Sequence, residues 1–203
     1  FFGLLNPFAL LTGVVSLSML VMHGAVYLQM RTDGVIAARA LAAVRLFGIV
    51  FIAAFVLAGV WQAYGIQGFR LVASPDPGTS FSPLAKTVEQ AAGAWMANYA
   101  GHPWMWSAPV LAVAGAGLAI LLAAAGRTGA AFVLSGAALT GTILTAGFAM
   151  FPFIMPSSTV PNVSLTVYDA VSSHHTLNLM FIAVVVFLPI VLAYTSWVYR
   201  VLR

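Results

Sequence analysis

Five side chains in this sequence could bind a metal or a haem, or carry a proton. They are His23, His102, Asp169, His174 and His175. His23 lies inside an apolar stretch, about 10 Å from its C-terminal end at the rise of an α-helix. An ionisable group at such a place is a functional candidate, here as a haem ligand or proton relay. The alternative is a neutral imidazole bonded to a neighbouring helix, and no second His lies at a similar depth to complete a bis-His haem site.

The other three histidines belong to two polar connections that we expect on one side of a membrane. With Asp169 they offer imidazole and carboxylate ligands, which suit divalent metals. However, His174 and His175 are adjacent, and adjacent side chains on a helix diverge by about 100°. Only one of them could then easily face His102. We therefore predict no metal site, and we interpret these residues as interfacial histidines near helix ends.

The connection between the last two apolar stretches is rich in Pro, Ser and Thr and carries one acid, Asp169. A carboxylate and hydroxyls before a helix can accept hydrogen bonds from its free N–H groups. We expect them to pin the loop rather than to react. The loop residues that we single out are Pro156, Ser157, Ser158, Asp169, Ser172 and Ser173. No set of nucleophile, base and acid is present, so no catalytic residue is predicted.

The composition identifies the solvent that surrounds these residues. Of the 203 residues, 62% are apolar, 6% are charged and none is cysteine. Such a chain cannot cover a water-exposed surface, and without thiolates it cannot build an iron–sulfur cluster. Its net charge of +4 is spread over several loops and does not indicate nucleic-acid binding. We predict an all-α integral membrane protein of one domain, 1–203, with transmembrane spans at about 6–30, 42–65, 104–126, 129–151 and 175–200.

Basic residues predict how the spans are oriented. Six of the eight Lys and Arg fall on one side, which the positive-inside rule assigns to the cytoplasm: Arg31, Arg39, Arg45, Arg127, Arg200 and Arg203. The N-terminus is then outside and the C-terminus cytoplasmic. Since the sequence opens at Phe1 without an initiator Met or a signal peptide, we expect a segment of a longer polypeptide that has already crossed the membrane.

Local patterns give three further expectations. The long outer connection, 66–103, contains a turn at 74–79 and a possible short helix from Pro83, in which Lys86 and Glu89 would pair weakly one turn apart; a solvated connector is the alternative. Gly-rich stretches at 114–117 and 136–141 allow the third and fourth spans to approach closely as antiparallel neighbours. Thr140, Thr142 and Thr145 are expected to bond to carbonyls of their own helix.

Several stretches, in order along the whole chain, resemble one membrane protein family. They are LNPFALLTGVV at 5–15, GAVYLQMRT at 24–32, FPFIMPSST at 151–159, SLTVYDAVSS at 164–173, and TLNLM at 176–180 with Pro189 and YTSW at 194–197. Together they resemble subunit II of cytochrome bd-type quinol oxidase, and they correspond to its C-terminal half. The resemblance implies a four-helix bundle plus an additional helix, with four helices upstream.

In that family, subunits I and II form a heterodimer in the bacterial cytoplasmic (inner) membrane that oxidises quinol and reduces dioxygen to water. Haems b and d and the quinol-oxidation loop belong to subunit I. The resemblance therefore implies a non-haem scaffold subunit, with subunit I as partner. A structural quinone, membrane lipid and a small single-helix subunit are further partners that it suggests.

Two other functions compete with this interpretation. The first is one half of a secondary transporter, a class that usually shows broken helices and polar residues at the membrane centre; the predicted spans show neither clearly. The second is a subunit that donates His23 as a haem ligand to a partner chain.

Overall fold

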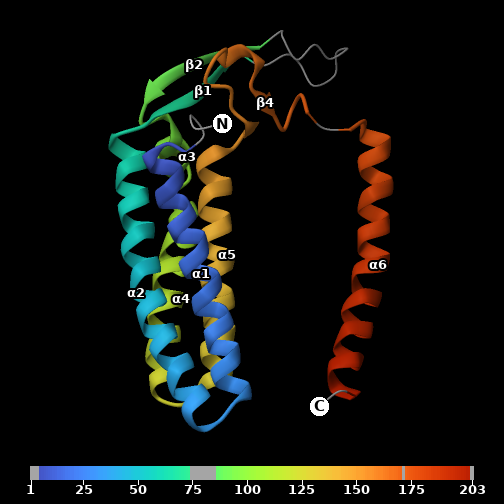
Figure 1. Ribbon diagram of the computed structural model, residues 1–203. Coiled ribbons are helices and arrows are strands. Elements are labelled where there is room, and N and C mark those ends of the chain that lie inside the picture. The colour runs from blue at the N-terminus through green and yellow to red at the C-terminus, as the bar shows by residue number, and fades with distance from the viewer. Residues whose placement is uncertain (1–4, 74–85, 171, 202–203) are drawn as a thin grey trace.

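The computed structural model describes residues 5–73, 86–170 and 172–201. Four long helices form an antiparallel bundle (Figure 1): α1 (Pro7–Arg31), α2 (Gly34–Tyr64), α4 (Ser107–Ala124) and α5 (Thr128–Met150). A fifth, α6 (His174–Val201), stands apart from the bundle and buries none of its side chains. Each of these helices is long and apolar enough to cross a membrane. The predicted helical membrane fold, a four-helix bundle with an additional helix, is confirmed.

Local signals explain where the bundle helices begin and turn. Asn6 starts α1, because its Oδ1 accepts a hydrogen bond from the N–H of Ala9 (2.8 Å) and Pro7 suits the first helical position. Between α4 and α5, Gly126 adopts a positive φ of 74°. That conformation lets the N–H of Arg127 bond to the carbonyl of Leu122 (2.9 Å), which caps α4. A turn this tight makes α4 and α5 antiparallel neighbours.

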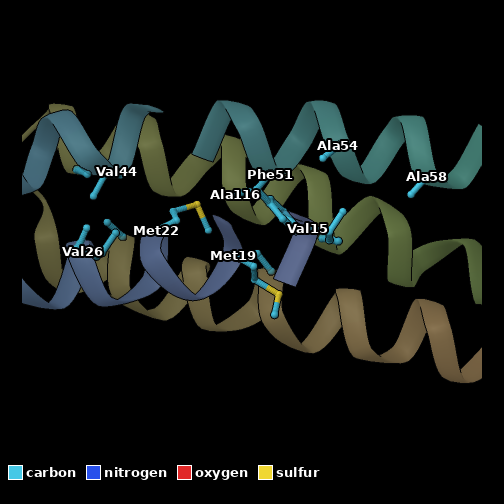
Figure 2. Close-up of a cluster of buried hydrophobic side chains, with 14 residues drawn as sticks. Val15, Met19, Met22, Val26, Val44, Phe51, Ala54, Ala58 and Ala116 are labelled. Atoms are coloured by element: carbon cyan, nitrogen blue, oxygen red, sulfur yellow. The ribbon is translucent and has the colours of Figure 1, made fainter. Parts of the chain in front are cut away.

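The two halves of the bundle core differ in the size of the side chains that fill them. Large side chains, among them Met22, Val26, Val44 and Phe51, fill the space beside α1 and α2 (Figure 2). Between α4 and α5 the interface consists of small residues, and a Cβ added at Gly141 would lie 2.6 Å from the backbone N of Ala112. The expected close approach of these two helices is confirmed.

The second span is longer than the sequence analysis predicted. Helix α2 begins at Gly34 rather than near residue 42, so Arg39 lies in the helix and not in the connection before it. The physical reason is that the Ala-rich stretch 37–43 is strongly helix-forming, and it continues the helix beyond its apolar part. The third span also differs, since a 3₁₀ turn, η3 (Pro103–Trp106), precedes α4.

The long connection after α2 folds into strands as well as turns. Strand β1 (Gln67–Ala73) pairs antiparallel with β2 (Thr87–Ala92), so that Arg70 faces Glu89 across the ladder. The helix expected from Pro83 is therefore wrong where it can be described, because Thr87 and Val88 pair with β1 instead. The helix's first residues, 83–85, and the turn at 74–79 lie outside the described residues.

Short elements complete this end of the molecule. After β2 come η2 (Ala94–Met96) and α3 (Ala97–Gly101). After α5, β3 (Phe153–Met155) pairs with β4 (Leu165–Thr166) on either side of η4 (Pro161–Val163). Figure 1 shows all of them at the end of the bundle opposite the α1–α2 turn. We call residues 66–73, 86–106 and 151–170 the cap.

Candidate functional site

The cap has an apolar core of its own. Phe69 on β1, Trp95 in η2 and Phe153 on β3 form an aromatic cluster with ring centroids 5.6–6.2 Å apart. Val88 on β2 is buried with Trp95 and Phe153. Aromatic pairs at these separations favour tilted and edge-to-face contacts such as these. The cluster joins three segments that are distant in sequence and fixes the cap as a packed unit.

A buried ion pair lies within the cap. The Lys86 ammonium bonds the Asp169 carboxylate, and only 2% and 3% of the two side chains are exposed. The same carboxylate accepts a hydrogen bond from the backbone N–H of Thr166. The pairing of Lys86 with Glu89 expected from sequence is wrong, because Glu89 lies on an exposed strand position opposite Arg70. The partner of Lys86 is instead 83 residues away.

The electrostatics of Asp169 favour its charged form. Burial by itself opposes ionisation, but hydrogen bonds from Lys86 and Thr166 and the attraction of the ammonium outweigh it. Together they hold the pKa of Asp169 below its usual value of 3.8. Asp169 is therefore a carboxylate at neutral pH. It is suited to holding the two cap segments together and is poorly suited to proton exchange.

The loop motif identified from sequence is partly built into the cap. Ser157 donates its N–H to Ser164 Oγ (2.9 Å) and accepts at Oγ from Val160 (3.3 Å). At the start of α6, Ser173 Oγ accepts from the N–H of Thr176 (3.4 Å). Pro156 is half-buried, whereas Ser158 and Ser172 are exposed.

Amide and phenol groups attach α3 to the end of α5. Asn98 Nδ2 donates to the carbonyls of Phe148 (2.8 Å) and Phe151 (2.6 Å), in the turn where helical carbonyls lose their partners. Next to it, the hydroxyl of Tyr99 donates to the carbonyl of Thr145 (2.8 Å). These contacts place the cap directly on the bundle.

Inside the bundle, His23 on α1 is engaged by α5. Its Nδ1 lies 2.7 Å from Ser135 Oγ, and its ring stacks on Phe132 with centroids 4.6 Å apart. The Ser135 hydroxyl donates its single proton to the carbonyl of Phe132 (2.8 Å). It follows that Nδ1 carries the imidazole proton and donates to Ser135. The geometry matches a histidine that joins two helices.

Other polar groups of the bundle follow the same pattern. Gln29 donates its Nε2 to the carbonyl of Ala123 (3.0 Å), which links α1 to α4. As expected, three threonines of α5 bond to carbonyls of their own helix at 2.7–3.1 Å: Thr140, Thr142 and Thr145.

The remaining histidines are not assembled with other ligands. His102 lies between α3 and η3, and His174 and His175 are the first residues of α6; all three are exposed. Over the described parts of the chain, no group of three or more His, Cys, Asp or Glu is placed to hold a metal ion.

Comparison with known proteins covers the whole chain. The model of the family "Cytochrome bd terminal oxidase subunit II" matches residues 1–202. The chain belongs to this family.

Relatives of the chain within the cytochrome bd subunit II family agree over nearly its full length. It is 48% identical to cytochrome bd-I ubiquinol oxidase subunit 2 of Escherichia coli (strain K12), over 98% of this chain and 52% of the relative. It is also 48% identical to a probable cytochrome oxidase subunit 2 of Haemophilus influenzae, over 98% of this chain and 52% of the relative. Cytochrome bd ubiquinol oxidase subunit 2 of Bacillus subtilis is 28% identical, over 98% of this chain and 50% of the relative. The chain spans about half the length of these relatives.

Membership of the cytochrome bd subunit II family, with five apolar helices, identifies the chain as a multi-pass protein of the bacterial cytoplasmic membrane.

The features that sequence reasoning missed are long-range ones. They include the Lys86–Asp169 pair, the bond from the Val88 N–H to Asn162 (2.8 Å) and the Asn98 contacts. An isolated lysine beside a Pro-rich loop was the single available signal for the ion pair, and it did not identify the partner.

Proposed function

We propose that this chain is part of the non-haem subunit II of a cytochrome bd-type quinol oxidase, with haems b and d held by subunit I. The observation that carries the proposal is the family match over residues 1–202, together with 48% identity to the Escherichia coli subunit over 98% of this chain. In such a complex, quinol gives electrons to haem and dioxygen is reduced to water. This chain contributes structure to that reaction rather than reacting groups.

The geometry supports a scaffold role. His23 is half-buried, and its ring is stacked and hydrogen bonded against α5, so that it joins two helices of the bundle. The cap ion pair is locked by burial and hydrogen bonds. Helix α6 exposes nearly its whole surface, and it needs other helices or lipid around it. We infer that subunit I, the rest of subunit II, or lipid surrounds it, and that a structural quinone and a small single-helix subunit are further partners.

The orientation that we propose puts the cap outside and the C-terminus in the cytoplasm. The α1–α2 and α4–α5 turns and the C-terminal end of α6 lie at the same end in Figure 1. That end carries Arg31, Arg39, Arg45, Arg127 and Arg200, and the positive-inside rule places it in the cytoplasm. The cap then lies on the side where the family oxidises quinol.

A transporter half is not favoured. The four bundle helices are continuous over their described lengths, whereas transporters usually bind substrate at broken helices.

The oxidase proposal is tested by purifying the full-length subunit from membranes through an affinity tag. We expect a haem-bearing membrane subunit to co-purify and to support quinol-driven oxygen uptake. Recovery of the subunit without any haem protein partner would contradict the proposal.

A further inference from the structure

A groove of about 450 Å³ runs between α1 and α2 near the turn that joins them. Val21 and Leu28 of α1 and Ile36 of α2 supply apolar walls, and Gly24 leaves its middle open. Arg39 is part of the lining. The groove thus combines an apolar trough with one permanently charged group.

The depth of the groove follows from the lengths of its two helices. About 20 helical residues cross the hydrocarbon core of a bilayer. About 20 residues counted from the cap end of α1, at Pro7, reach Val26, and about 20 counted from the cap end of α2, at Tyr64, reach Arg45. The hydrocarbon core therefore ends near these two residues. Val21 then lies at acyl-chain depth, while Arg39 lies beyond the core among headgroups. A ligand in this groove spans the boundary between the two regions.

The positive charge around the groove favours a negatively charged ligand. Arg39 is exposed, and the one ion pair among the described residues, Lys86–Asp169, lies at the opposite end of the bundle. The turn end of the bundle carries a single acid, Asp33, and three more arginines: Arg31, Arg45 and Arg127. A guanidinium at headgroup depth without an acidic partner suits a phosphate, which it binds in a fork geometry.

We propose that the groove binds one anionic phospholipid, with its phosphate at Arg39 and an acyl chain along Val21, Gly24 and Leu28. Charge complementarity and depth together favour this occupant over a neutral quinone or an apolar helix. The proposal concerns a binding site of this chain and does not depend on the oxidase function.

Glycine substitutions offer a direct way to fill the groove. A Cβ added at Gly24 would meet nothing within 4 Å, and Gly24 lines the groove, so we expect the side chain of Gly24→Leu to extend into the trough. Gly13, on the same helix and outside the groove, is equally open and gives a matched control. For the charge, Arg45→Gln matches Arg39→Gln, because Arg45 lies on α2 outside the groove and about 240° around the axis.

The test uses the full-length subunit in its purified, delipidated complex, titrated with dioleoyl phosphatidylglycerol and followed by native mass spectrometry. We expect one tight phosphatidylglycerol per subunit and weaker binding of dioleoyl phosphatidylcholine. Arg39→Gln should weaken phosphatidylglycerol binding about five-fold, the effect of one basic side chain near an anionic surface. Gly24→Leu should abolish the tight site, while Arg45→Gln and Gly13→Leu leave it intact.

Three results would overturn the proposal. The first is equal loss of binding in Arg39→Gln and Arg45→Gln, which would mean a diffuse surface charge effect. The second is unchanged binding in Gly24→Leu. The third is the absence of a tight phosphatidylglycerol site in the wild-type complex, as expected if a helix of another segment or a quinone fills the groove.

Discussion

Replacing Lys86 with Met is expected to lower the free energy of unfolding of the subunit by about 3–5 kcal/mol, because it leaves the Asp169 carboxylate buried without its counter-ion. Since 3% of that side chain is exposed, water has little access to replace the lost ammonium. Removing the ammonium also removes the hydrogen bond and the attraction that hold the pKa of Asp169 below its usual value, whereas the burial that raises it remains. Stability of the purified subunit in mixed micelles, measured by titration with a denaturing detergent, checks the loss.

The exposed Arg70 offers the control for this change. Arg70 faces Glu89 across the β1–β2 ladder, and both side chains are exposed. Arg70→Met removes the same charge from the same part of the cap, with an expected cost of no more than about 1 kcal/mol. The double variant Lys86→Met with Asp169→Leu should recover most of the loss, because no buried charge is then left unpaired. Equal losses in Lys86→Met and Arg70→Met would show that the pair does not hold the cap.

Acid should weaken the same ion pair. A carboxylate whose folded-state pKa is depressed contributes its stabilisation in full above its unfolded pKa, which is near 3.8. That contribution is lost as the pH falls through the still lower folded-state value. The cap is therefore held by this pair across the neutral range.

Replacing Gly141 with Ala is expected to destabilise the bundle by about 1–3 kcal/mol, the usual cost of overpacking a filled interior. The added Cβ would lie 2.6 Å from the backbone N of Ala112 and 2.7 Å from the carbonyl O of Ala108. These are backbone atoms, and they cannot rotate away as the end of a side chain can. Helices α4 and α5 must therefore separate, which opens the small-residue interface along its length. The same detergent titration measures the effect.

Gly147 provides the matched position on the same helix. A Cβ at Gly147 would meet nothing within 4 Å, so Gly147→Ala should leave stability unchanged or raise it slightly. A Gly141→Ala variant as stable as Gly147→Ala would contradict the close backbone contact between α4 and α5.

The helices could be predicted from sequence because each apolar run is as long as a bilayer is thick. The Gly-rich stretches also predicted the α4–α5 contact, since small residues have few other uses at that density. Helix α2 was predicted too short because Arg39 interrupts the apolar run without interrupting the helix. The apolar run indicates which part of a helix lies in the hydrocarbon core, whereas helix propensity determines how far the helix continues beyond it.

The cap could not be predicted in the same way. Strand β2 has the sequence TVEQAA, which lacks the alternation of a half-buried strand, and its pairing with β1 is set by contacts with Trp95 and Phe153. Lys86 and Asp169 are 83 residues apart, and no local rule joins them. For His23 the sequence predicted a bond to a neighbouring helix as one alternative. The partner, Ser135, depends on how α1 and α5 pack and became known from the structure.

The optical difference spectrum of the purified complex carrying His23→Ala tests the scaffold role most directly. If the haems belong to the partner subunit, the reduced-minus-oxidised haem bands and the haem-to-protein ratio should equal those of the wild type. Ser135→Ala, which removes the partner of His23 but keeps the imidazole, serves as the control for packing. Loss of a haem band in His23→Ala, with the band retained in Ser135→Ala, would contradict the account and make His23 a haem ligand.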